Sequence, residues 1–201
     1  MVALIKMFHR QEERFSKKLR TCADRIISIF QPHVRPIVRG KAKAKVEFGA
    51  KIGLGAVAGF SFVDHISRPS YNEASDLKRQ IDLYKERYGY YPKEIEADKI
   101  YLNKENRKIL EDLHIVCHCT PLGRPPKNAD PEKEIARGKA SASRDEVEGS
   151  FETAKRVYRA NNIRAKLEDT SESWIASCYF AKNIKKFLSV LLCVLIRIFS
   201  F

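Results

Sequence analysis

The middle of the sequence alternates twice between a helical and a strand pattern, and this alternation restricts the fold more than any other feature. Apolar residues in 73–88 recur at the spacing of one helix face, and residues 103–113 form a second predicted helix. Short strands are predicted over 94–98 and 115–119. Helix, strand, helix, strand in succession is typical of a parallel α/β layer.

A strand hairpin is predicted just before this layer. Residues 46–57 and 60–67 alternate apolar with smaller or polar residues, which is the period of a strand. The dipeptide Ala58-Gly59 between them is a turn signal. Further upstream, residues 25–30 are rich in β-branched side chains and predict another short strand.

The composition favours a folded chain with a polyanionic partner. Lys and Arg number 38 against 25 Asp and Glu, which gives a formal net charge of +13 over 201 residues. Apolar residues make up 44%, which is too many for a disordered chain. A basic excess of this kind favours nucleic acid or an anionic membrane surface as the partner. The five irregularly spaced cysteines and the lack of a recognisable signal peptide lead us to expect a cytoplasmic protein, and a nucleic-acid partner would make it nucleoid-associated.

Residues 187–196 form the most apolar stretch of the sequence. The stretch is shorter than the roughly 20 residues that a bilayer span needs, so we expect no stable membrane span. The preferred interpretation is a C-terminal helix packed on the core. An interfacial anchor that places Lys182, Lys185 and Lys186 on lipid headgroups is the alternative. Apolar residues on nearly all sides of the tail argue against a surface amphipathic helix.

Two carboxylates occupy positions suited to a metal site. Asp98 ends a predicted strand, and open parallel sheets bind ligands beyond the carboxyl ends of their strands. Glu148 lies on a predicted helix that starts near Arg144, and the helical spacing places Arg144, Glu148 and Lys155 on one face. Mg²⁺ binds carboxylates and supports phosphoryl transfer. The alternatives are an Asp that only caps the next segment and a solvated helix face crossed by ion pairs.

Two basic segments are candidates for binding DNA phosphates. One is a predicted loop over 34–45, and the other is the run over 155–166. The residues singled out in them are Arg35, Arg39, Lys41, Lys155 and Arg156.

Several sequence motifs occur in order along the chain. They are DRIISIFQPHVRPIVRGK at 24–41, EFGAKIGLGAV, YNEASDL, ADKIY at 97–101 and LGRPPK at 122–127. Together they resemble the catalytic part of bacterial insertion-sequence transposases of the DDE type. Arg144, Glu148 and Lys155 are similar to that family's R-x3-E-x6-K signature, and the resemblance covers about residues 20–188.

The resemblance implies an RNase H-like α/β fold, a mixed sheet with flanking helices. It also implies cutting and joining of DNA strands with two divalent ions, Mg²⁺ or Mn²⁺. By the same resemblance, Asp98 and Glu148 are the second and third catalytic acids and metal ligands, while Arg144 and Lys155 lie near the DNA ends. The implied partner is double-stranded DNA, at the element's terminal repeats and at the target, and a homo-oligomer is compatible with this.

The sequence departs from the family at its start. The family's first catalytic Asp lies upstream of the DRIISI segment, and neither Asp24 nor Asp64 has the context of that acid. We therefore expect an N-terminally truncated transposase, with a catalytically inactive DNA-binding remnant of a decayed insertion sequence as the alternative. The expected division is a peripheral helical segment at 1–23, a partial catalytic domain at 24–188 with a linker at about 122–143, and an apolar tail at 189–201.

Overall fold

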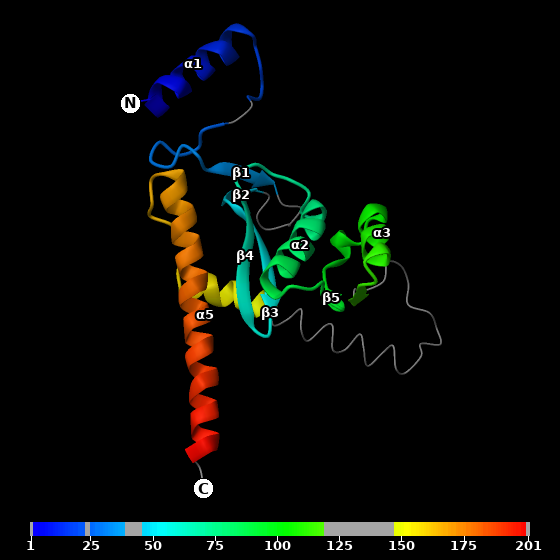
Figure 1. Ribbon diagram of the computed structural model, residues 1–201. Coiled ribbons are helices and arrows are strands. Elements are labelled where there is room, and N and C mark those ends of the chain that lie inside the picture. The colour runs from blue at the N-terminus through cyan, green and yellow to red at the C-terminus, as the bar shows by residue number, and fades with distance from the viewer. Residues whose placement is uncertain (1, 23–24, 39–45, 119–146, 200–201) are drawn as a thin grey trace, which may run out of the picture. The chain divides into compact units, whose positions relative to one another are not determined.

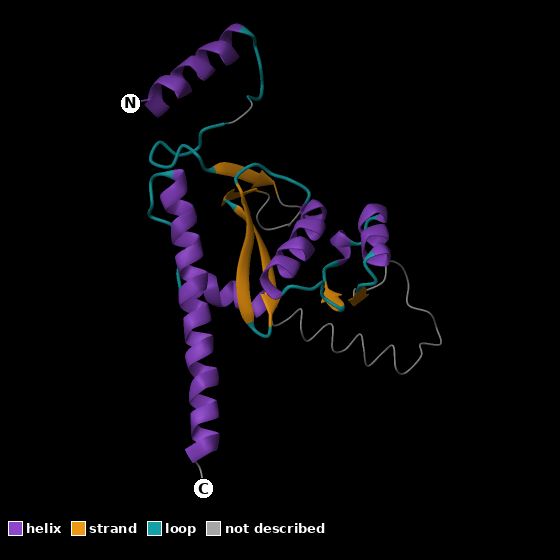
Figure 2. Cartoon of the chain, viewed as in Figure 1, coloured by secondary structure: helices purple, strands orange, loops and turns teal. Residues whose placement is uncertain are grey.

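A computed structural model describes residues 2–22, 25–38, 46–118 and 147–199 (Figure 1). The chain divides into two units. The first takes Met1–Ile52, Ile66–Tyr71 and Ile163–Ser177, and the second takes Gly53–His65, Asn72–Asn162 and Cys178–Phe201. The described strands form small two-stranded sheets, and helices make up most of the remaining regular structure (Figure 2). The predicted linker over 122–143 lies outside the described residues.

The first unit contains the predicted N-terminal helix and a short antiparallel sheet. Helix α1 spans Val2–Ser16 and buries none of its residues. Strand β1, Arg35–Val38, pairs antiparallel with β2, Val46–Gly49. The prediction of a loop over 34–45 is therefore wrong for β1, whose backbone is paired along its length with β2. Residues 39–45 are not described.

The strand predicted over 25–30 is wrong. Residues 25–28 have no regular structure and residues 29–30 form a bend. The Ser28 hydroxyl accepts a hydrogen bond from the Gln31 backbone N–H at 3.1 Å, and the Gln31 side chain donates to the carbonyls of Ile163 and Ala165, both at 2.9 Å. A local turn and the hydrogen bonds of the Gln31 side chain thus replace strand pairing. These contacts outweigh the intrinsic preference of β-branched residues for strands.

The predicted hairpin forms with one interruption. Strands β3, Lys51–Val57, and β4, Phe60–Ser67, pair in one sheet. The turn residues Ala58 and Gly59 both have positive φ, 50° and 78°, as tight hairpin turns require. The single strand predicted over 46–57 is divided into β2 and β3, because Gly49 adopts φ 142° and breaks the extended run.

The alternating segment folds as predicted. A short 3-10 turn η1, Glu73–Ser75, leads into helix α2, Asp76–Tyr88, which lies alongside the β3–β4 hairpin (Figure 1). Strand β5, Glu94–Glu96, pairs parallel with β6, Val116–His118. Between these strands lie η2, Lys99–Tyr101, and helix α3, Lys104–Asp112.

The second unit has its core between α2, α3 and the β5–β6 pair. The buried members of this core are Leu77, Ile81, Leu110 and Ile115. Ile95 of β5 and Cys117 of β6 pack against them. The two helices thus bury their apolar stripes beside the parallel pair, and the end of β5 is held against a packed layer.

The C-terminal helix is longer than predicted, and its end does not pack on the core. Helix α5 spans Glu168–Phe199 and buries Ile175, Cys178 and Tyr179. Every residue from 187 to 199 is exposed, so the predicted packing of the apolar tail is wrong. Leu, Val and Ile continue the helix there without a described surface that covers them. None of the helices in the described ranges is long and apolar enough to cross a membrane.

Candidate functional site

Asp98 lies just beyond the carboxyl end of β5. Its backbone is extended, with φ −71° and ψ 153°, and Oδ1 accepts a hydrogen bond from the Lys99 backbone N–H at 2.7 Å. This N-cap satisfies one of the unpaired donors at the start of η2. Asp98 is also exposed. The structure therefore shows the capping role, and it places the carboxylate at the strand end that the sequence predicted.

A buried asparagine, which the sequence analysis did not single out, fixes the segment after Asp98. Asn106 is only 5% exposed, and its Nδ2 donates to the carbonyls of Tyr101 at 2.9 Å and Ala74 at 2.8 Å. Its backbone N–H donates to the side chain of Asn103, which caps α3, at 2.7 Å. These bonds tie η1, η2 and α3 together. The buried Asn106 amide has its hydrogen-bond partners, and these bonds fix the path of the chain after Asp98.

The electrostatic surroundings of this segment are acidic. Burial raises the pKa of Tyr101 to about 12, and the carboxylates of Glu73, Asp76 and Asp98 raise it further. Tyr101 therefore stays neutral at physiological pH, and all three carboxylates disfavour its ionised form.

Glu148 lies on the outer face of a second helical segment. Residues 147–156 are helical, and Glu148 is exposed. The inner face is fixed by Ala154, which is fully buried, by a hydrogen bond between the hydroxyls of Ser150 and Ser61 at 2.9 Å, and by the edge-on contact of Phe151 with Tyr179. Packing on one face thus directs Glu148 away from the core.

Lys155 and Arg156 are held by an acid of the same helix. Glu152 lies 3.5 Å from Lys155 Nζ and 3.3 Å from Arg156 Nε. All three residues are exposed, so the pairs are weak and a phosphate could compete with Glu152 for both cations. This is the ion-paired helix face that the sequence offered as an alternative for this stripe.

Asp98 and Glu148 belong to the same unit. Within the ranges that the structure describes, no three His, Cys, Asp or Glu side chains form a group that could hold a metal ion. Carboxylate oxygens are the hard ligands that Mg²⁺ prefers. Arg144, predicted to share the face of Glu148, is outside the described residues, as are Arg39 and Lys41.

Asp64 has a structural environment. Its side chain is only 1% exposed and forms an ion pair with Arg87 of α2. Burial raises the pKa of Asp64, although the Arg87 guanidinium acts in the opposite direction. A Cβ at Gly55 of β3 would lie 2.5 Å from Asp64 Oδ2, so the carboxylate fits only because position 55 is glycine. Asp64 thus joins the hairpin to α2.

Arg35 of the first unit is directed at its own backbone. Nη1 donates to the carbonyl of Pro32 at 2.6 Å and to that of Val34 at 3.2 Å. The residue lines a cavity of about 360 Å³ together with Arg68, Glu168 and Glu172. Two carboxylates beside two guanidinium groups balance the charge of this cavity, so it differs from an open basic patch.

Comparison with known families gives one match. Residues 95–184 match the model of the transposase DDE domain. The matched range starts within β5, includes Asp98 and the helical segment with Glu148, ends about halfway along α5, and excludes Arg35. Comparison with curated proteins and with solved structures gave no match.

Small sheets with flanking helices form a mixed α/β structure, consistent with an RNase H-like fold. Within that structure the matched segment begins at Ile95 of β5, three residues before the candidate acid at its end. Over residues 95–184, a little under half of its length, the chain is similar to the transposase DDE domain.

Proposed function

We propose that the chain binds double-stranded DNA and supports metal-dependent phosphoryl transfer on it, with Asp98 and Glu148 as the two metal ligands. The observation that carries this proposal is the match of residues 95–184 to the transposase DDE domain, because it includes both acids. Both acids are exposed and belong to one unit, so substrate and ion have access to them.

The residues of the site have distinct roles in this proposal. Asp98 is oriented by its hydrogen bond from the Lys99 N–H, and Glu148 is oriented by the packed inner face of its helix. A divalent ion, when bound, stabilises charge on the phosphate and lowers the pKa of an attacking water. Lys155 and Arg156 exchange their pairing with Glu152 for DNA phosphates, which positions the strand along the helix.

The remaining basic residues complete the proposed DNA surface. By resemblance, Arg144 lies near the DNA ends. The basic run of the sequence makes Arg35, Arg39 and Lys41 candidates for phosphate contacts elsewhere on the substrate, and for Arg35 these contacts would replace its hydrogen bonds to the Pro32 and Val34 carbonyls. The substrate proposed is DNA that carries the terminal repeats of the element, followed by target DNA. Mg²⁺ or Mn²⁺ is the proposed cofactor, because a pair of carboxylates favours hard ions.

The test of catalysis is nicking of supercoiled DNA that carries the element's ends, in Mn²⁺, by the full chain and by three variants. Asp98→Asn and Glu148→Gln should each lower the rate at least about tenfold, because each removes a ligand charge. Glu86→Gln is the control, since Glu86 is an exposed carboxylate of α2 that has no part in the proposed site, and its rate should stay close to that of the unmodified chain. Nicking that survives both site variants would refute the assignment.

The test of DNA binding is the salt dependence of affinity for the same duplex. Lys155→Gln with Arg156→Gln should weaken binding and make the slope of log affinity against log salt shallower by about 1.8, which corresponds to two phosphate contacts. Arg107→Gln with Lys108→Gln on α3 is the charge-matched control and should leave the slope less changed. Binding without any metal-dependent nicking would assign the chain to the alternative, an inactive DNA-binding remnant.

A further inference from the structure

The end of α5 is an exposed apolar helix with a narrow polar stripe. Residues 187–199 are all exposed, and thirteen residues of helix extend about 20 Å at the usual rise per residue. Ser189, Cys193 and Arg197 follow one another at intervals of four and therefore form one stripe. The other positions are large apolar residues with 41–76% of their surface exposed: Phe187, Leu188, Val190, Leu191, Leu192, Val194, Leu195, Ile196, Ile198 and Phe199.

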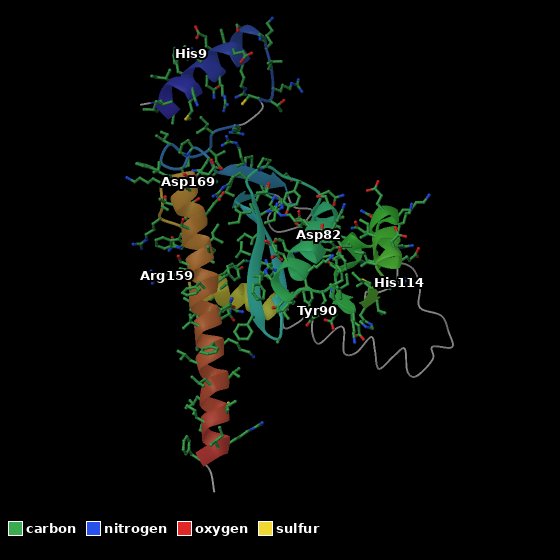
Figure 3. The ribbon with its side chains drawn as sticks, in the orientation of Figure 1. His9, Asp82, Tyr90, His114, Arg159 and Asp169 are labelled. Atoms are coloured by element: carbon green, nitrogen blue, oxygen red, sulfur yellow. The ribbon has the colours of Figure 1, made fainter. Side chains whose placement is uncertain are left out.

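This register revises the view from the sequence that the tail is apolar on nearly all sides. The stripe continues upstream through Lys186, three residues before Ser189. Side chains project from the C-terminal half of α5 in Figure 3 without a described element packed over them. The tail is therefore amphipathic, with a broad apolar arc and a thin polar edge.

The charges on this helix have one sign. Lys185, Lys186 and Arg197 lie on or beside the apolar segment, and the sequence has no Asp or Glu after Glu172. Binding of a helix to a bilayer interface increases with the apolar area that it buries and with the attraction of its basic residues to anionic lipids, and this segment offers both. There the apolar arc enters the acyl region, while the Lys and Arg side chains extend to the headgroups.

We propose that residues 187–199 bind the surface of an anionic lipid bilayer, with the helix axis in the plane of the membrane. A second copy of the chain fits this surface less well. Contact between two helices buries about two of every seven positions on each helix. Here all positions outside the polar stripe are apolar, so a second helix would leave most of the apolar arc exposed. A bilayer covers the whole arc, and the net charge of +13 favours an anionic surface over a like-charged copy.

The experiment is co-sedimentation of the full chain with vesicles made of equal parts phosphatidylcholine and phosphatidylglycerol. Leu191 and Leu195 lie at the middle of the apolar arc, so Leu191→Gln with Leu195→Gln should weaken binding at least about a hundredfold. The matched control also introduces two glutamines, but on the polar stripe instead of the apolar arc. Ser189→Gln with Cys193→Gln should change binding less than about threefold, and because none of these residues packs on the core, circular dichroism should be the same for all variants.

Two further sets of variants test how positive charge and the proposed DNA surface contribute to vesicle binding. Lys185→Gln with Lys186→Gln and Arg197→Gln should weaken binding to the mixed vesicles by roughly fivefold per charge, with little effect on pure phosphatidylcholine vesicles. Lys155→Gln with Arg156→Gln should weaken vesicle binding far less than Leu191→Gln with Leu195→Gln, which separates this inference from the proposed DNA surface. Equal binding by the leucine and control variants would overturn the inference. So would a lipid-free dimer, seen by sedimentation velocity, that ignores vesicles.

Discussion

Gly55→Ala tests whether the buried Asp64–Arg87 pair requires a residue without a side chain on the facing strand. An added Cβ would lie 2.5 Å from Asp64 Oδ2 and 3.5 Å from its Cγ. The Asp64 side chain is 1% exposed, and the Arg87 guanidinium that holds it also stacks 4.6 Å from the Phe62 ring centroid. The carboxylate therefore has little room to retreat, and either β3 or the ion pair must shift.

The magnitude follows from overpacking. Inserting one methyl group into a close-packed site costs about 1–3 kcal/mol. Replacing Gly by Ala also lowers the entropy of the unfolded chain, which offsets about 0.4–1 kcal/mol where the backbone is unstrained. Gly55 has no positive φ, so this gain applies. We expect a net loss of about 1–2 kcal/mol in the free energy of unfolding.

The assay is urea unfolding monitored by circular dichroism, with Gly149→Ala as the control. Gly149 lies in the helical segment 147–156, and nothing lies within 4 Å of its added Cβ, so this variant should be more stable by about 0.5–1 kcal/mol. In a double-mutant cycle, Asp64→Ala should remove most of the cost of Gly55→Ala, because it removes the colliding oxygen. A Gly55→Ala protein as stable as the unmodified chain, or a cost that persists with Asp64→Ala, would refute this reasoning.

Two other predictions follow from buried polar groups. Asn106→Ala should lower the free energy of unfolding by about 1–3 kcal/mol, because it leaves the Tyr101 carbonyl without its donor, and hydrogen exchange should show weaker protection of η2 and α3 than of α2. Unchanged protection would contradict the anchoring role. Burial and the neighbouring Arg68 lower the pKa of His33 below its usual 6.5, so the unfolded chain binds its proton more tightly than the folded chain. Stability should then fall as the pH drops below about 6.5, and His33→Asn should flatten this slope in urea midpoints measured across that range; an equal slope in the variant would contradict it.

The elements set by local signals were predictable from the sequence. Helix α2 has a regular apolar stripe, with Asn72 accepting from the Ala74 N–H before η1 and Gly89 at φ 82° after α2. The hairpin has its turn residues, and the parallel β5–β6 pair follows from the alternation of elements. The helix caps and the hairpin turn depend on neighbours a few residues apart in the chain, and the β5–β6 pair joins residues 22 positions apart across a single crossover.

The predictions that were wrong concern segments whose structure depends on distant partners. Residues 25–30 have strand-like side chains, but the contacts of Gln31 with Ile163 and Ala165 decide their path, and those partners lie 132 and 134 residues away. The apolar tail was expected to pack because apolar residues usually do, yet it extends α5 beyond its last buried residues. Apolar composition alone does not say which surface, protein or lipid, covers a helix.

The residues of the candidate site also differ in whether local sequence or distant contacts determine their role. Asp98 was predictable because a strand pattern ends there, and the structure adds the N-cap that orients it. Asn106 was not predictable, because its role depends on the Ala74 carbonyl, 32 residues away. The pairing of Lys155 and Arg156 with Glu152 was an alternative that helical spacing already offered, and the structure shows it.

The central claim is that Asp98 and Glu148 hold one divalent ion together, and Mn²⁺ binding measured by electron paramagnetic resonance tests it most directly. Asp98→Asn and Glu148→Gln should each weaken Mn²⁺ affinity at least about tenfold. The double variant should be scarcely weaker than either single one, because a shared ion is lost with its first ligand. Glu152→Gln should bind like the unmodified chain. Independent, additive losses, or affinity unchanged by both site variants, would contradict the claim.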